Sequence, residues 1–121
     1  MNTLRIVCFF VGGALVGGAA SGSLIQRASV RAPEKPNPLE GSDQAKRAGA
    51  KLYARECAAC HGITRQGRSN IPPLNQPEVY GAASGTLFCV LRSGSLHRGM
   101  PSFAHLPEVQ RWQIITFLQS R

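Results

Sequence analysis

Residues 42–121 of this chain contain too few large apolar side chains to build a core by themselves. Of these 80 positions, only 21 are Val, Ile, Leu, Met, Phe, Trp or Tyr. A core of that size is marginal for a chain of this length, and small domains usually add a disulfide, a metal or another bound group. We therefore expect a bound group to fill and brace the interior.

The segment Cys57-Ala58-Ala59-Cys60-His61 provides an attachment point for such a group. Its C-x-x-C-H pattern is the attachment site of c-type haem. Two thiols one helical turn apart can add to the two vinyl groups of haem, and the adjacent histidine can then face the iron. With 4 Cys and 3 His in 121 residues, chance gives ~0.003 such matches. The pattern predicts one haem c, attached through Cys57 and Cys60, with His61 as an iron ligand.

Three other uses of these cysteines fit the sequence less well. A thioredoxin-like redox pair belongs to a βαβ unit, and no segment alternates like a strand. A zinc site needs a fourth ligand in a paired motif, which neither Cys89 nor His97 provides. A structural disulfide between Cys57 and Cys60 leaves His61 unexplained. We expect Cys89, which lies in an apolar run, to be a small core residue rather than a ligand or a disulfide partner.

Three helices are predicted around the motif. The first covers residues 43–56, where apolar residues recur at helical spacing and Ser42 or Asp43 can cap the start. The second covers about residues 84–92. The third covers about residues 107–119, because a proline is favourable in a first helical turn. Since no segment shows the alternation of a strand, the pattern predicts an all-α fold.

Residues 42–121 resemble the small monohaem cytochromes c. Gly49 and Tyr53 stand eight and four residues before Cys57, where that family places the glycine of a helix crossing and an aromatic residue. The segment around Trp112 is similar to the last helix of the family, which crosses the first helix at that glycine. The resemblance implies a small cytochrome c fold, with three main helices wrapped around one covalently bound haem.

The resemblance also implies which loop residues flank the haem. Pro72-Pro73-Leu74 looks like the Pro-x-Leu loop of the family, in which the carbonyl of Pro72 accepts a hydrogen bond from His61. Leu74 then borders the haem. The side chains that the resemblance places against the haem are Leu74, Leu91, Leu96 and Phe103.

Met100 is implied as the sixth ligand of the iron. The segment from Leu91 to Phe103 is similar to the distal loop of the family, and the only other methionine is Met1. His97 and His105 flank Met100, but they lie in polar sequence and are expected to face solvent. A thioether ligand favours ferrous iron over a second imidazole, so the pair His61 and Met100 implies a comparatively high potential.

Residues 6–25 carry no charged side chain, which is typical of a secretory signal or of a membrane anchor. We leave both open for residues 1–23. Either one places the rest of the chain in the periplasm or elsewhere outside the cytoplasm, and an anchor could join a membrane complex through residues 6–25. Three prolines favour an extended linker over residues 24–41. The cytochrome domain is expected to cover residues 42–121.

The charge of the chain points to its possible partners. Lys and Arg number 14 against 6 Asp and Glu, a net charge of +8. The basic residues of interest are Arg47, Lys51, Arg55, Arg65, Arg68, Arg92 and Arg98. Such residues are usually a solvated surface, but they can also form a docking patch for an acidic redox partner or an anionic lipid. Nucleic acid is not an expected partner for an exported haem protein.

The predicted function is that of a one-electron carrier, which cycles a haem iron between Fe(II) and Fe(III). The chain could act alone or as the haem subunit of a respiratory or dehydrogenase complex. It is not expected to be an enzyme by itself, because His61 and Met100 leave substrate no coordination position. The alternative is a haem-based ligand-binding or peroxidatic protein with a displaceable Met100. A non-haem thiol oxidoreductase is a third possibility.

Overall fold

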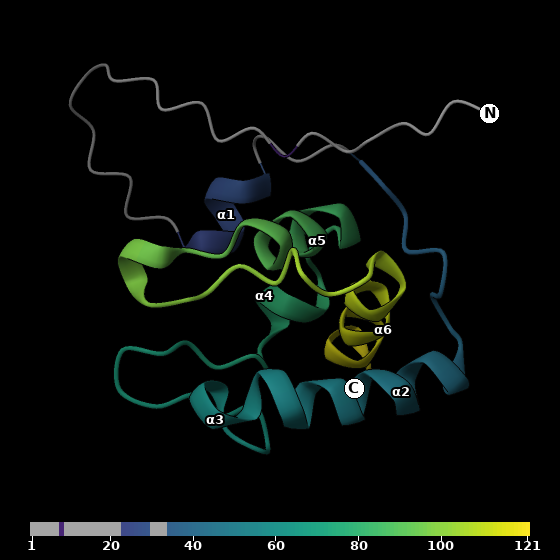
Figure 1. The fold of residues 1–121 in the computed structure, drawn as a ribbon, viewed down its shortest axis with the longest axis horizontal. Coiled ribbons are helices and arrows are strands. Elements are labelled where there is room, and N and C mark those ends of the chain that lie inside the picture. The colour runs from purple at the N-terminus through teal and green to yellow at the C-terminus, as the bar shows by residue number, and fades with distance from the viewer. Residues whose placement is uncertain (1–7, 9–22, 30–33) are drawn as a thin grey trace.

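A computed structural model of the chain describes Cys8, residues 23–29 and residues 34–121. Within these ranges the regular structure is helical, with two isolated β-bridges and no strand (Figure 1). This confirms the all-α prediction. The elements are α1 (Leu24–Ser29), α2 (Asp43–Glu56), α3 (Ala58–His61), α4 (Pro77–Tyr80), α5 (Ser84–Ser93), the 3-10 helix η1 (Leu96–Arg98) and α6 (Glu108–Gln119).

The predicted signal or anchor segment falls mostly outside the described ranges. In the part of the chain that the structure describes, no helix is both long and apolar enough to cross a membrane.

The three predicted helices are confirmed as α2, α5 and α6. The N-terminus of α2 is capped by Ser42, whose side chain accepts a hydrogen bond from the amide of Ala45 at 3.1 Å. Helix α5 ends one residue later than predicted, where Gly94 takes a positive φ of 63°. In α6, Pro107 is the N-cap rather than the first helical residue.

Helices α2 and α6 cross at Gly49, as the resemblance implied (Figure 1). A Cβ atom on Gly49 would lie 1.9 Å from the carbonyl oxygen of Gln113, so only glycine allows the two backbones to approach this closely. One helical turn further along, the rings of Tyr53 and Phe117 pack with their centroids 5.3 Å apart. The crossing therefore fixes the C-terminal end of α2, which leads into the C-x-x-C-H motif.

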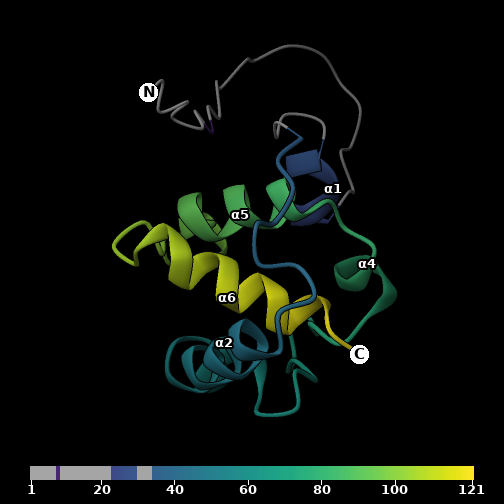
Figure 2. The same ribbon diagram turned by 90° about the vertical axis from the view of Figure 1, so that its right-hand side faces the viewer.

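Helix α5 packs on the other side of α6 (Figure 2). The rings of Phe88 and Trp112 stack with their centroids 4.3 Å apart, and Ile114 and Ile115 have no exposed surface. Helix α6 is thus covered on two sides. This agrees with the absence of a single apolar stripe in its sequence.

The proline-rich segment differs from the predicted extended linker. Helix α1 packs against α5, and residues 34–41 pass across α6 (Figure 2). The side-chain amide of Asn37 is buried and donates to the hydroxyl of Thr116 at 2.8 Å. The prolines do exclude a helix from residues 34–41. They do not prevent the segment from packing, because the hydroxyl of Thr116 on α6 pairs with the buried amide of Asn37 and with the carbonyl of Leu39.

The prediction for Cys89 was wrong in one respect. Cys89 is buried as expected, but it forms a disulfide with Cys8, across a Cα–Cα distance of 5.7 Å. The side chain of Cys89 leaves α5 towards the N-terminal part of the chain, where Cys8 lies within the distance that a disulfide spans. Local sequence cannot reveal this pairing, since 81 positions separate the two residues.

Candidate haem-binding site

The C-x-x-C-H motif forms a short helical turn at the end of α2. The amide of Cys57 donates to the carbonyl of Tyr53 at 2.9 Å, and the amide of His61 donates to the carbonyl of Cys57 at the same distance. Cys57 is buried and Cys60 is exposed, and both thiols are free. The turn holds the two sulfur atoms and the imidazole on one short, rigid element, as the attachment of haem c requires.

The imidazole of His61 is held by the carbonyl of Pro72. The Nδ1 atom of His61 lies 2.9 Å from the carbonyl oxygen of Pro72. A carbonyl can only accept a hydrogen bond, so Nδ1 carries the proton and Nε2 keeps its lone pair. Nε2 is then the atom that can bind iron. The structure therefore contains the hydrogen bond that the resemblance implied for Pro72.

The thiol of Cys57 is suited to a thioether. Burial, followed by the nearby charges of Glu56 and Cys60, raises the pKa of Cys57 to about 12. A zinc site would need this sulfur as a thiolate. A thioether carries no charge, so attaching Cys57 to a vinyl group places no ionised sulfur in the buried position. The residues of the motif thus fit haem c.

Main-chain hydrogen bonds close the proximal loop, which we define as residues 62–74. The amide of Gly67 donates to the carbonyl of His61 at 2.8 Å, and the amide of Leu74 donates to the carbonyl of Arg65 at 2.8 Å. Gly67 has a φ of 70°, and a Cβ atom there would lie 2.6 Å from the carbonyl oxygen of Ile71. This compact path brings Pro72 back to His61.

Met100 lies in a second closed loop. The amide of Ser95 donates to the carbonyl of Met100 at 2.8 Å, and the amide of Met100 donates to the carbonyl of Ser95 at 3.1 Å. The amide of Phe103 donates to the carbonyl of Leu91 on α5, at 2.8 Å. Met100 is half-buried and packs against the hydrophobic core. Its position as sixth ligand stays a prediction.

The two histidines near Met100 are exposed, as expected. His97 has a 3.5 Å contact between its Nδ1 atom and the hydroxyl of Ser95, and the ring of His105 lies beside that of Phe103.

The side chains that the resemblance places against the haem differ in how far they are buried. Leu91 and Phe103 are buried and Leu74 is half-buried, whereas Leu96 is 76% exposed and lies outside the core.

Arg65 does not belong to the solvated basic surface. Its Nη1 atom lies 3.4, 3.2 and 3.4 Å from the carbonyl oxygens of Phe117, Leu118 and Ser120, at the end of α6. Arg111 is also withdrawn from the surface, since it is buried with its guanidinium 4.5 Å above the ring of Phe88. Burial lowers the pKa of Arg111. Nothing in the local sequence distinguished these two arginines from the exposed ones.

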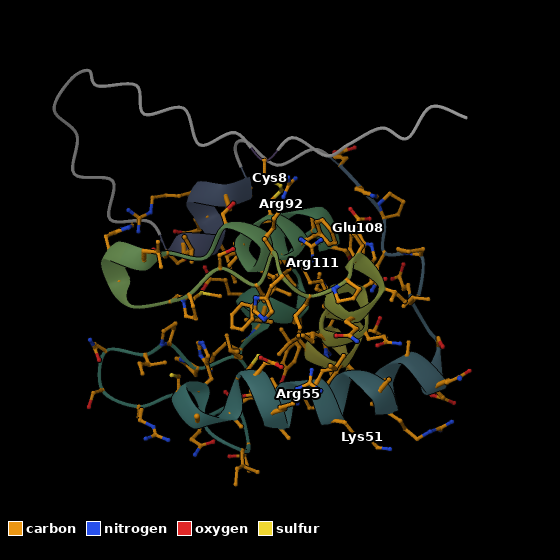
Figure 3. The ribbon with its side chains drawn as sticks, viewed as in Figure 1. Cys8, Lys51, Arg55, Arg92, Glu108 and Arg111 are labelled. Carbon is orange, nitrogen blue, oxygen red and sulfur yellow. A yellow bond between two sulfur atoms is a disulfide. The ribbon has the colours of Figure 1, made fainter. Side chains whose placement is uncertain are left out.

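Lys51 and Arg55 are exposed on α2, in agreement with the sequence analysis (Figure 3). Arg55 makes an ion pair with Glu56, with 2.6 Å between nitrogen and oxygen. Figure 3 shows both residues on the side of the molecule opposite Cys8. Lys51 and Arg55 therefore lie exposed on the helix that leads into the motif, as does Arg47.

The fold and the held histidine together place this chain in one class, the haem c electron-transfer domains. Residues 44–118 match the family model described as cytochrome c oxidase, cbb3-type, subunit III. The match spans more than half of the chain, which therefore belongs to this cytochrome c family. Haem c, covalently bound, is its cofactor, and electron transfer is its general role.

Two curated proteins are similar in sequence. A quinohemoprotein alcohol dehydrogenase, ADH-IIG, of Pseudomonas putida is 38% identical over 76 residues, which are 60% of this chain and 10% of that protein. A thiosulfate dehydrogenase of Stutzerimonas stutzeri (strain A1501) is 28% identical over 95 residues, which are 73% of this chain and 30% of that protein. The chain thus spans less than a third of the length of either relative.

A solved structure shares the fold. Cytochrome cL from the marine methylotrophic bacterium Methylophaga aminisulfidivorans MPT superposes with a TM-score of 0.60 at 20% sequence identity. The alignment covers 89% of this chain and 74% of that one. At this identity the likeness confirms the small cytochrome c fold and carries no statement about partners.

Proposed function

We propose that this protein is a one-electron carrier with His61 and Met100 as axial ligands, and that it serves a dehydrogenase or respiratory partner outside the cytoplasm. The observation that carries the proposal is the 2.9 Å hydrogen bond from His61 to Pro72, which prepares Nε2 for iron. Bound haem supplies the couple between Fe(II) and Fe(III). The residues of the chain hold the ligands in place and exclude water.

His61 and Met100 act on the potential in opposite directions. The hydrogen bond to Pro72 gives the imidazole of His61 more negative character, which favours ferric iron. The thioether of Met100 favours ferrous iron relative to a second imidazole. If His61 and Met100 both bind the iron of a bound haem, they would leave no coordination position for a substrate. Leu74, half-buried beside the Pro72 loop, is the side chain that we place against the haem on the proximal side.

The proposed partner is a protein with an acidic docking surface. The two curated relatives are named as dehydrogenases, and in each the similar region is a minor part of a longer protein. This supports a role as the haem component of a dehydrogenase, either as a separate carrier or in a complex joined through residues 6–25.

The exposed surface supports a protein partner. Lys51 and Arg55 are exposed on α2, and Ile63 is 85% exposed two residues after His61. Exposed positive charge and an exposed apolar side chain both suit a transient redox complex. Nucleic acid is not part of this proposal.

The spectrum of the purified holoprotein tests the ligand set. We expect haem that resists acid–organic extraction, a weak sulfur-to-iron charge-transfer band in the far red for the oxidised protein, and no binding of carbon monoxide by the reduced protein. Haem that is released by the extraction would contradict covalent attachment. Rapid carbon monoxide binding by the native reduced protein would show an open sixth position and would support the ligand-binding alternative instead.

A further inference from the structure

We propose that Arg65 is a positioning residue that couples the C-terminus of α6 to the proximal loop and thereby tunes the hydrogen bond between His61 and Pro72. The proposal rests on the proposed role of His61 as an iron ligand. It assigns to Arg65 an effect on the haem potential, although its side chain lies at the end of a helix and not at the iron.

The side chain of Arg65 stabilises the end of α6. The last carbonyl groups of a helix have no partner within the helix and carry its partial negative charge. Helix α6 has no basic residue in its own last turn. Arg65 supplies that positive charge from a distant part of the chain, with its Nη1 atom near three carbonyl oxygens and its guanidinium 5.0 Å from the ring of Phe117.

The main chain of Arg65 has an uncommon conformation. Its φ is 63°, in the left-handed region that residues other than glycine, asparagine and aspartate rarely adopt. Such a conformation persists only where surrounding contacts outweigh its cost. The hydrogen bonds and the ring contact of the guanidinium provide this compensation. The contacts of the Arg65 guanidinium with α6 and the backbone shape of the proximal loop therefore depend on each other.

The backbone shape of Arg65 determines where Pro72 lies. The carbonyl of Arg65 accepts a 2.8 Å hydrogen bond from the amide of Leu74, which closes the loop two residues after Pro72. Pro72 in turn accepts the hydrogen bond from Nδ1 of His61. A continuous path thus runs from the end of α6 through Arg65 and Leu74 to the imidazole. Releasing Arg65 should loosen the loop and lengthen the hydrogen bond to His61.

The direction of the effect follows from the chemistry of the imidazole. A weaker hydrogen bond from Nδ1 leaves the ring less basic, and a less basic ligand stabilises ferric iron less. The midpoint potential of the haem should therefore rise when Arg65 no longer reaches α6. The proton on Nδ1 of His61 should also exchange faster with solvent, because the bond that protects it is weaker.

The experiment compares holoproteins that carry single substitutions. Arg65→Gln removes the positive charge, and its shorter side chain no longer contacts α6. Arg65→Gly removes the side-chain contacts with α6 and also relieves the backbone strain. Arg68→Gln is the matched control, because Arg68 lies in the same loop and its side chain is exposed. Midpoint potentials from spectroelectrochemistry are combined with NMR measurement of the exchange of the His61 Nδ1 proton. We expect Arg65→Gln, but not the control, to show a higher potential and faster exchange. Arg65→Gly should show a smaller change, because glycine adopts a φ of 63° without strain.

Two results would overturn the coupling. One is a potential and an exchange rate that stay at wild-type values in Arg65→Gln while its melting temperature falls, since Arg65 would then act on stability alone. The other is an equal shift in Arg68→Gln, which would indicate a general charge effect. If Arg65→Gln yields no holoprotein, Arg65→Lys carries the test, because it keeps the charge with less reach and should shift the potential in the same direction by less. The ligand set is tested on the wild-type spectrum alone, so its failure is distinct from a failure of the coupling.

Discussion

The hydroxyl of Tyr53 donates a 2.7 Å hydrogen bond to the carbonyl oxygen of Gly62, the residue that follows His61. Tyr53 lies on α2 and is 2% exposed. The bond therefore fastens the buried face of α2 to the first residue of the proximal loop. The loop is held at its first residue by Tyr53 and three residues later by Arg65.

The first prediction concerns the pH dependence of stability. Burial is the main reason that the pKa of Tyr53 is raised to about 12, from an ordinary value of about 10. Folding then favours the neutral phenol, so the contribution of Tyr53 is complete below about pH 10 and is lost as the pH rises towards 12. Tyr53→Phe should lower the unfolding free energy by about 1 kcal/mol at pH 8 and flatten this alkaline decline. Urea unfolding of the holoprotein from pH 8 to pH 11.5 measures both effects, with Tyr80→Phe as the control.

The second prediction concerns the distal ligand. Met100→Ala should remove the far-red charge-transfer band of the oxidised protein and lower its midpoint potential, because the sulfur that favours ferrous iron is gone. His97→Ala and His105→Ala should leave both properties unchanged, since the two imidazoles are exposed. The ligand assignment is wrong if Met100→Ala keeps the band while either histidine variant loses it.

The third prediction concerns the helix crossing. A Cβ atom at Gly49 would overlap the carbonyl of Gln113, so Gly49→Ala must push α2 and α6 apart. We expect a loss of about 3 kcal/mol in unfolding free energy, measured by denaturant titration of the holoprotein. Gly81→Ala is the control, because the nearest atom to its Cβ would be 3.2 Å away and its φ is negative. Equal stability of the two variants would argue against a close crossing.

The fourth prediction concerns residues 34–41. Thr116→Val should cost about 1–3 kcal/mol, since it leaves the buried amide of Asn37 without its partner. A double-mutant cycle with Asn37→Ala separates this interaction from the loss of either side chain. A coupling energy near zero would mean that the segment is a free linker after all.

The fifth prediction concerns the docking surface. Lys51→Glu and Arg55→Glu should slow electron transfer to the natural partner, and the wild-type rate should fall as salt is added, because steering is screened beyond ~8 Å at physiological ionic strength. Lys46→Glu makes the same change of charge earlier on α2 and should have a smaller effect. Stopped-flow mixing at several salt concentrations measures these rates. A rate that does not depend on salt would point to a permanent complex.

Local patterns predicted the helices well, because each one has its signals within its own sequence. Ser42 caps α2 and the glycine after α5 ends it, and neither depends on distant contacts. The hydrogen bond between His61 and Pro72 could be anticipated only through the family resemblance, because the two residues are eleven positions apart.

Features that depend on distant residues were missed. Arg65 was grouped with the basic residues of a solvated or docking surface, yet its side chain reaches residues 52 to 55 positions away. The prolines before Ser42 exclude a helix but say nothing about Thr116, whose hydroxyl accepts a hydrogen bond from the buried amide of Asn37. These contacts depend on how α6 lies across the fold, and no local pattern encodes that arrangement.

Because Cys8 and Cys89 form a disulfide, the number of free thiols in the protein depends on whether Cys8 is still present. The chain has four cysteines, and two of them become thioethers in the holoprotein. A chain that retains Cys8 in the disulfide then has no free thiol. A chain that has lost Cys8 by proteolysis and reduction has one, at Cys89, hidden from reagents until the protein unfolds. One free thiol in denatured, unreduced holoprotein therefore identifies a chain that has lost Cys8, independently of any mass measurement. Cleavage of the main chain alone leaves Cys8 attached to Cys89 and gives no free thiol.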